Sequence, residues 1–226
     1  MTDFILILPV LLFSVVAHEY AHAWTALRQG DQTAYSLGRL TFNPVPHLDP
    51  FMSVIFPIGL YILTSLSGSP WTFGAAKPVP VNPRNYRNYR RGDLIVSSAG
   101  VVANLLIAIG CGALFVALGL VAARLPALLG TFGTLQRMMA MGIFLNVLLA
   151  FFNLIPIPPL DGSHLLYHVL PPAWGARYRQ LGRFGFMVLM VTFLIPGLWQ
   201  VLLWPVGLVT SIAHAAIGGY TLPTLR

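Results

Sequence analysis

The sequence predicts an all-α, polytopic membrane protein, and three observations support this fold class. The chain has 226 residues, of which 57% are hydrophobic and only 8% charged, whereas soluble domains carry about 25% charged residues. Its mean hydropathy is +0.77. Most of its long apolar runs are long enough to cross a bilayer as helices, and the runs are 4–27, 51–66, 94–123, 138–155 and 184–217.

Ionisable residues interrupt the first apolar run, in the stretch VVAHEYAHAW at 15–24. His18 and His22 are four residues apart, so they share one helix face and can bind one Zn²⁺ through two imidazole nitrogens. Glu19 can then reach a zinc-activated water and accept its proton. Core histidines or a polar packing cluster are the alternatives. Ionisable residues at membrane depth cost about 2.5–3.5 kcal/mol each, and a bound cation offsets that cost.

A catalytic zinc usually has three protein ligands and a water, so a third ligand is needed. Cys111 is the only cysteine and lies in an apolar run, which excludes a thiolate cage and an intramolecular disulfide. The stretch FNLIPIPPLDGSHLL at 151–165 ends a helix with three prolines and then presents Asp161. Broken backbone at membrane depth is buried or lines a wet cavity. LDG alone would be an ordinary turn, but beside HExxH it supplies the best third ligand.

The two motifs together resemble the site-2 protease family of intramembrane zinc metalloproteases, in its small bacterial or archaeal form without a PDZ domain. Three further stretches fit this family, so the resemblance covers about residues 10 to 166. They are GRLTFNPVPHLDP at 38–50, AAKPVPVNPRNYRN at 75–88 and SAGVVANLL at 98–106. The last one departs from the family pattern Ala-Gly-Pro-x-x-Asn, because Val101 replaces the proline, while Asn104 remains.

The resemblance implies a zinc metalloendopeptidase that cuts within or near transmembrane segments of membrane-anchored proteins, as in regulated intramembrane proteolysis. His18, His22 and Asp161 would bind one Zn²⁺ per chain, and Glu19 would be the general base. Asn153 maps onto a family asparagine that holds the substrate strand or stabilises the oxyanion.

The expected fold has three transmembrane helices, a re-entrant or interfacial element and one or two C-terminal membrane segments. We expect one peptidase domain over 1–226, with its catalytic core at about 4–166 and a C-terminal membrane segment at about 183–217.

The distribution of basic residues predicts the topology through the positive-inside rule. Segments 67–93 and 156–183 are rich in arginine, whereas 124–137 has only Arg124 and Arg137 at its two ends. The first two segments are therefore expected in the cytoplasm and the third outside, which places Asp161 near the cytoplasmic face.

His18 reaches the same depth only if the first helix runs inward. In that case 51–66 cannot cross once, so we expect it to be re-entrant or interfacial. A full span there, with the chain starting inside, is the rival topology, but it would separate the metal ligands. For 184–217 we expect one outward span, which a short broken segment could follow.

Other polar residues leave alternatives open. Asn104 and Asn146 suit interhelical hydrogen bonding and a functional role equally well. His47 could line the pocket, but a loop histidine is more often solvated. His164 is not assigned as a metal ligand, because three protein ligands already complete a catalytic site. The sequence around His168 and His214 does not indicate a function for either residue.

The predicted partners are a membrane-spanning protein substrate and the lipid bilayer. The net charge of +7 does not indicate nucleic acid, because the basic residues lie in short loops between membrane runs. The expected location is the cytoplasmic (plasma) membrane of a prokaryote, as a multi-pass protein with its active site towards the cytoplasm. A transition-metal transporter and a non-catalytic homologue that binds membrane segments are the alternative functions. A transporter would need ligands along a path across the bilayer, and an intact Glu19 argues against the non-catalytic homologue.

Overall fold

The structure is a computed structural model that describes residues 2–55, 77–122, 124–193, 195 and 197–223, together with residues 58, 59, 62 and 66. The described residues form helices and connecting loops, with no β-strand among them. Three helices are long and apolar enough to cross a membrane: α1 (Thr2–Gln29), α4 (Tyr89–Ala122) and α5 (Leu129–Leu154). The predicted all-α polytopic fold is therefore confirmed.

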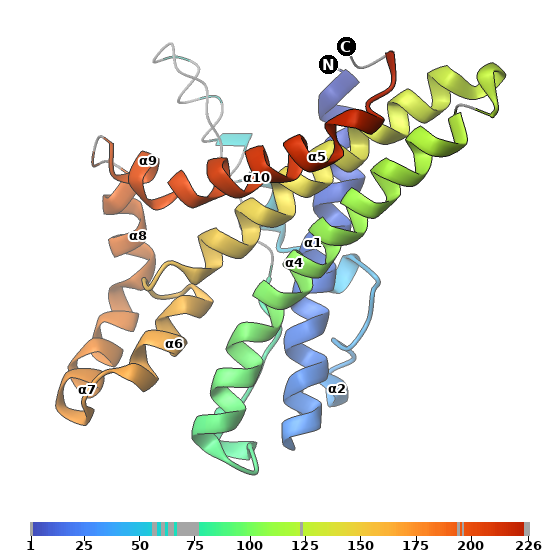
Figure 1. The fold of residues 1–226 in the computed structure, drawn as a ribbon. Helices are drawn as coiled ribbons and strands as arrows, with labels where there is room; N and C mark the ends of the chain where they lie inside the picture. The colour runs from blue at the N-terminus through green and yellow to red at the C-terminus, as the bar shows by residue number, and fades with distance from the viewer. Residues whose placement is uncertain are drawn as a thin grey trace.

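The three long helices form an antiparallel bundle in which α4 packs against both α1 and α5. Figure 1 shows α1 running away from the N-terminus and α4 returning beside it. The Arg87 N–H donates to the Gln29 carbonyl at 2.8 Å, which joins the end of α1 to the entry of α4. α5 then leads back to α6 (Asp161–Val169) and α7 (Pro172–Leu181) at this same end. This arrangement brings the start of α6 to the level of the histidines in α1.

Both later spans begin earlier than the apolar runs predicted. α4 starts at Tyr89 rather than at residue 94, and α5 starts at Leu129 rather than at 138, so Arg137 lies inside a helix. Only Arg124, Leu125 and η4 (Pro126–Leu128) are described between the two helices. The 34 residues of α4 rise roughly 51 Å, well beyond a hydrocarbon core of about 30 Å. An apolar run marks where lipid-compatible residues end, whereas the helix continues past it.

The C-terminal apolar stretch is divided into short helices. Gly197, with φ of +78°, takes the left-handed conformation that starts the turn into α9, and a proline at the first turn suits the start of α10. The helices are η5 (Gly182–Phe184), α8 (Gly185–Phe193), α9 (Leu198–Leu202), α10 (Trp204–Ile217) and η6 (Gly218–Tyr220). In Figure 1, α8 leads away from α7 and α10 crosses back over α5.

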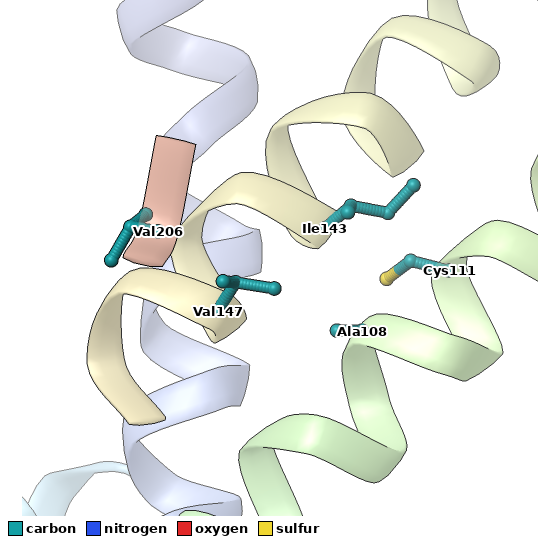
Figure 2. Close-up of a cluster of buried hydrophobic side chains, with 5 residues drawn as sticks. All are labelled: Ala108, Cys111, Ile143, Val147 and Val206. Atoms are coloured by element: carbon teal, nitrogen blue, oxygen red, sulfur yellow. The ribbon is translucent and has the colours of Figure 1, made fainter. Parts of the chain in front are cut away.

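The main apolar core lies where α4, α5 and α10 meet. Figure 2 shows its five buried side chains, which are Ala108, Cys111, Ile143, Val147 and Val206. Small residues allow these helices to approach closely, since a Cβ at Gly142 would lie 2.6 Å from Cys111 Sγ. Large apolar side chains on α4, such as Leu106 and Ile109, are exposed instead. This distribution suits a bundle surrounded by lipid.

Short elements connect α1 to α4: α2 (Thr33–Ser36), η1 (Val45–His47), the π-helix η2 (Pro50–Ile55) and η3 (Pro83–Asn85). Beyond η2, the predicted re-entrant element at 51–66 is described only at residues 58, 59, 62 and 66. The rest lies outside the described residues, so the element stays a prediction.

Candidate metal centre

Three of the predicted site residues converge at the middle of α1 and the first residue of α6. His18 and His22 lie one turn apart on α1, and their Nε2 atoms are 3.0 Å apart. Asp161 Oδ2 lies 3.4 Å from His18 Nε2 and 3.3 Å from His22 Nε2. Both imidazoles are buried. Among the described residues, this is the one group of three potential ligands whose donor atoms all lie within 4.8 Å of one another.

Hydrogen bonds on the far side of each ring fix the tautomers of the two histidines. His22 Nδ1 lies 2.7 Å from the Val96 carbonyl, which can only accept, so Nδ1 carries the proton. His18 Nδ1 lies 2.6 Å from Asn104 Oδ1. The orientation of Asn104 follows from Asn146, whose Nδ2 donates to the Gly142 carbonyl and whose Oδ1 accepts from Asn104 Nδ2 at 2.9 Å. His18 therefore also has its proton on Nδ1.

The consequence is a cluster of three acceptors without a donor. Each Nε2 presents a lone pair to the other and to Asp161 Oδ2, a buried oxygen without a hydrogen-bond partner among the described residues. Lone pairs this close repel one another unless a cation or a proton lies between them. Two imidazoles and a carboxylate are a ligand set that zinc prefers, and a partner on the other ring nitrogen is usual for zinc-bound histidines. The residues present therefore fit a zinc ion.

Gly100 on α4 provides the space for the two rings. A Cβ at this position would lie 2.4 Å from His18 Cε1 and 2.5 Å from the Nε2 atoms of both His18 and His22. Gly162 makes a similar close approach on the other side, because its Cβ would lie 2.1 Å from the Leu154 carbonyl oxygen. The absence of a side chain at Gly100 lets α4 pack against the ligand rings, and its absence at Gly162 lets the start of α6 pack against the end of α5.

Segment 77–82 holds Glu19. The structure describes the chain again from residue 77, after a gap that begins at residue 67. The Val79 N–H donates to Glu19 Oε2 at 2.8 Å. Because the residues on both sides of Val79 are prolines, its N–H is the only backbone donor at positions 78–80. The Val79 side chain packs with Ala23 and Ala34 in a small buried cluster. The segment thus fixes one carboxylate oxygen of Glu19 beside the histidine pair.

The two ends of segment 77–82 are also tied down. Arg39 Nη2 donates to the Lys77 carbonyl at 3.0 Å, and the Lys77 N–H donates to the His47 carbonyl at 2.9 Å. At the other end, the Asn82 N–H donates to Asp31 Oδ2 at 2.7 Å. The stretch 38–47 and the turn after α1 therefore clamp the segment that contacts Glu19.

Asp31 is a fully buried carboxylate just beyond the end of α1. Burial alone would raise its pKa, but hydrogen bonds outweigh burial and hold the pKa below its usual value. The donors are the Asn82 and Thr33 N–H groups, the Thr33 hydroxyl and the Asn85 amide. The charged form of Asp31 is thus part of the folded structure.

The structure does not place the other sequence candidates in the ligand cluster. Asn153 lies in the last turn of α5, and its amide nitrogen donates to the Leu149 carbonyl of its own helix. The expectation that His47 is solvated is wrong: it is 1% exposed, and its Nε2 lies 3.1 Å from the Thr41 carbonyl. Its own carbonyl accepts from the Lys77 N–H, so segment 77–82 lies against this part of the chain. Asn104 and Asn146, whose role the sequence left open, join helices and support His18 at the same time.

The fold and the site together define a class of protein: a membrane-embedded protein with a candidate site for a divalent cation. The chain belongs to peptidase family M50, the site-2 protease family, because the family model matches residues 6–195. The predicted resemblance is therefore confirmed.

The curated relatives agree with this assignment. The chain is 39% identical over 197 residues to "Putative zinc metalloprotease YwhC" of Bacillus subtilis, covering 86% of this chain and 82% of that protein. It is 31% identical over 195 residues to "Putative zinc metalloprotease Rip2" of Mycolicibacterium smegmatis, covering 86% and 69%. The Rip2 of Mycobacterium tuberculosis strain H37Rv is 32% identical over 199 residues, with the same coverage. No solved structure gives a significant match.

Proposed function

We propose that the protein is an intramembrane zinc metalloendopeptidase, which hydrolyses peptide bonds within or near transmembrane segments of membrane-anchored proteins. The observation that carries the proposal is the convergence of His18, His22 and Asp161 through three acceptor atoms inside a bundle of apolar helices. Membership of family M50 and the names of the relatives support zinc and peptide hydrolysis.

In this proposal each site residue has a distinct role. His18 Nε2, His22 Nε2 and Asp161 Oδ2 would hold a zinc ion, which when bound would polarise the scissile carbonyl and acidify a water molecule. Glu19 keeps Oε2 on the Val79 N–H and accepts the water's proton on its other oxygen. It then passes the proton to the departing amine nitrogen. Asn153 holds the extended substrate or donates to the developing oxyanion after its amide turns away from Leu149.

The helix arrangement also supports an orientation. The end of α1, the entry of α4 and helices α6 and α7 lie at one end of the bundle (Figure 1). This end carries most of the arginines, namely Arg28, Arg84, Arg87, Arg90, Arg91, Arg177, Arg179 and Arg183. By the positive-inside rule it faces the cytoplasm. We therefore place the active site towards the cytoplasmic side of a prokaryotic plasma membrane, in one peptidase domain over 1–226.

The test compares the wild-type protein with Glu19→Gln, purified in detergent. The change keeps the size of the side chain and its hydrogen bond to Val79 but removes the base. We expect both proteins to retain zinc and only the wild type to cleave a single-span model substrate. Zinc flux into vesicles that survives Glu19→Gln would indicate a transporter instead. A zinc-loaded wild type that binds the substrate without cutting it would indicate the non-catalytic homologue.

A further inference from the structure

A second group of titratable side chains joins α4 to α6 outside the metal centre. Asp93, in the first turns of α4, is only 2% exposed. His168 Nε2 lies 2.7 Å from Asp93 Oδ2, and His164 Nδ1 lies 3.3 Å from Asp93 Oδ1. The side chain of His168 is buried, whereas that of His164 is half exposed. A buried carboxylate is stable only when it is paired in this way.

The geometry of this group is that of a hydrogen-bonded pair and not of a second metal centre. A nitrogen–oxygen distance of 2.7 Å matches a charge-assisted hydrogen bond, in which the proton lies between the two atoms. The contrast with the metal centre is direct, since there both Nδ1 protons are committed elsewhere and the facing atoms are all acceptors. A proton links Asp93 to His168, whereas the three facing atoms of the metal centre have no donor among them and fit a cation.

The two groups occupy the same helix faces. On α6, His164 and His168 follow Asp161 by three and seven residues, so all three side chains share one face. On α4, Asp93 precedes Val96 by one turn, and the Val96 carbonyl accepts from His22. The interface between α4 and α6 therefore contains Asp93, His164 and His168, and one helical turn further along it lie the metal ligands.

We propose that Asp93, His164 and His168 form a latch that holds α6 against α4 and thereby fixes Asp161 opposite the two histidines. The inference rests on the proposed metal centre. Asp161 needs such support because it follows the proline-rich break after α5, and the side chain of the N-cap residue of α6, Leu160, makes no capping hydrogen bond. Ligand distances at a metal must be kept within about 0.2 Å. Asp93 and His168 are therefore positioning residues, which act on the metal only through Asp161.

The test measures zinc affinity of the full chain in detergent by competition with a chelator, together with the visible spectrum of the cobalt-substituted protein. Asp93→Asn removes the buried charge. His168→Phe keeps a ring but removes the donor, whereas His168→Gln keeps a donor. We expect Asp93→Asn and His168→Phe to weaken zinc binding about 10-fold or more and to change the cobalt spectrum, and His168→Gln to restore most of the affinity.

Gln136→Leu is the matched control for a general loss of stability. Gln136 is fully buried at the other end of α5, where it donates to the Tyr220 carbonyl and accepts from the Leu222 N–H. This variant should lower Tm and leave zinc affinity and the cobalt spectrum unchanged. Wild-type affinity and spectrum in Asp93→Asn and His168→Phe would overturn the latch. If Asp93→Asn does not fold, the two His168 variants decide. A wild type that binds no zinc would overturn the metal centre itself.

Discussion

The substitution Gly100→Ala places a methyl group where the two ligand rings meet. Its Cβ would lie 2.4 Å from His18 Cε1 and 2.5 Å from both Nε2 atoms, whereas ordinary contacts start at 3.4 Å. The rings and α4 must therefore separate by about 1 Å. Neither ring can move alone, because Asn104 and Val96 hold the Nδ1 atoms at 2.6 and 2.7 Å, and both residues lie on α4 together with Gly100.

The magnitude follows from these two hydrogen bonds. A displacement of about 1 Å lengthens both beyond hydrogen-bonding distance. Each is worth about 1 kcal/mol, so their loss weakens the metal site by about 2 kcal/mol, or about 30-fold in the zinc Kd. Displacement of the Nε2 atoms from their ligand positions adds to this loss. We expect Gly100→Ala to weaken zinc binding at least 30-fold and to abolish peptide cleavage.

The assay is chelator competition on the purified protein, with Gly110→Ala as the control. Gly110 lies on the same helix, and among the described residues no atom lies within 4 Å of its would-be Cβ. Alanine is the better helix former by about 1 kcal/mol, so the control should bind zinc normally and be no less stable. If Gly100→Ala binds zinc as tightly as the wild type, the two rings do not occupy the positions described, and the assignment of the ligand atoms is refuted.

Three further variants test the surroundings of the site. Val79→Pro removes the N–H that binds Glu19, so kcat should fall about 10-fold or more with zinc retained. The control Val79→Ala keeps this N–H and should leave the cleavage rate nearly unchanged. Equal cleavage rates in the two variants would contradict the role of the N–H. Asn104→Leu leaves the His18 Nδ1–H without an acceptor and should weaken zinc binding about 10- to 100-fold by chelator competition, an effect absent if the ring is fixed by packing alone. Asp31→Asn should lower Tm at pH 7. Because the folded pKa of Asp31 is lowered, its stabilisation exists above its ordinary pKa of about 4 and is lost as the pH falls through the folded pKa. The difference in Tm should therefore narrow in acid, and a constant difference from pH 7 to pH 3 would show that the charge is irrelevant.

The candidate ligands could be predicted from the sequence because membrane context makes ionisable residues informative. Spacing alone places His18 and His22 on one face, and the shortage of other acids in the apolar chain singles out Asp161. Their convergence follows from helix direction, which the arginine distribution encodes. None of this needs knowledge of how the helices are rotated about their own axes.

The supporting residues could not be predicted because they depend on that rotation. Gly100 is one of 21 glycines, and only the packing of α1 on α4 reveals which one faces the rings. Residue 93 falls at the end of the predicted cytoplasmic segment 67–93, because the apolar run starts at residue 94. Since α4 begins at Tyr89, Asp93 is instead a buried helical residue that faces His168. Because the sequence does not show this helix start, it also does not show that Asp93 is the partner of His164 and His168.

Helix α4 supplies none of the three candidate ligands, yet one of its faces organises all of them. Val96, Gly100 and Asn104 are spaced by four residues, so they form one stripe on α4. Along this stripe the Val96 carbonyl accepts from His22, Gly100 leaves space for both rings, and the Asn104 side chain accepts from His18. Asp93 extends it by one turn towards α6. The two rings are buried between helices, so each Nδ1–H needs a protein acceptor. An acceptor on a neighbouring helix also sets the rotation of that helix. The polar groups that keep the two histidines in the correct tautomer are therefore the same groups that fix the register of α1 against α4.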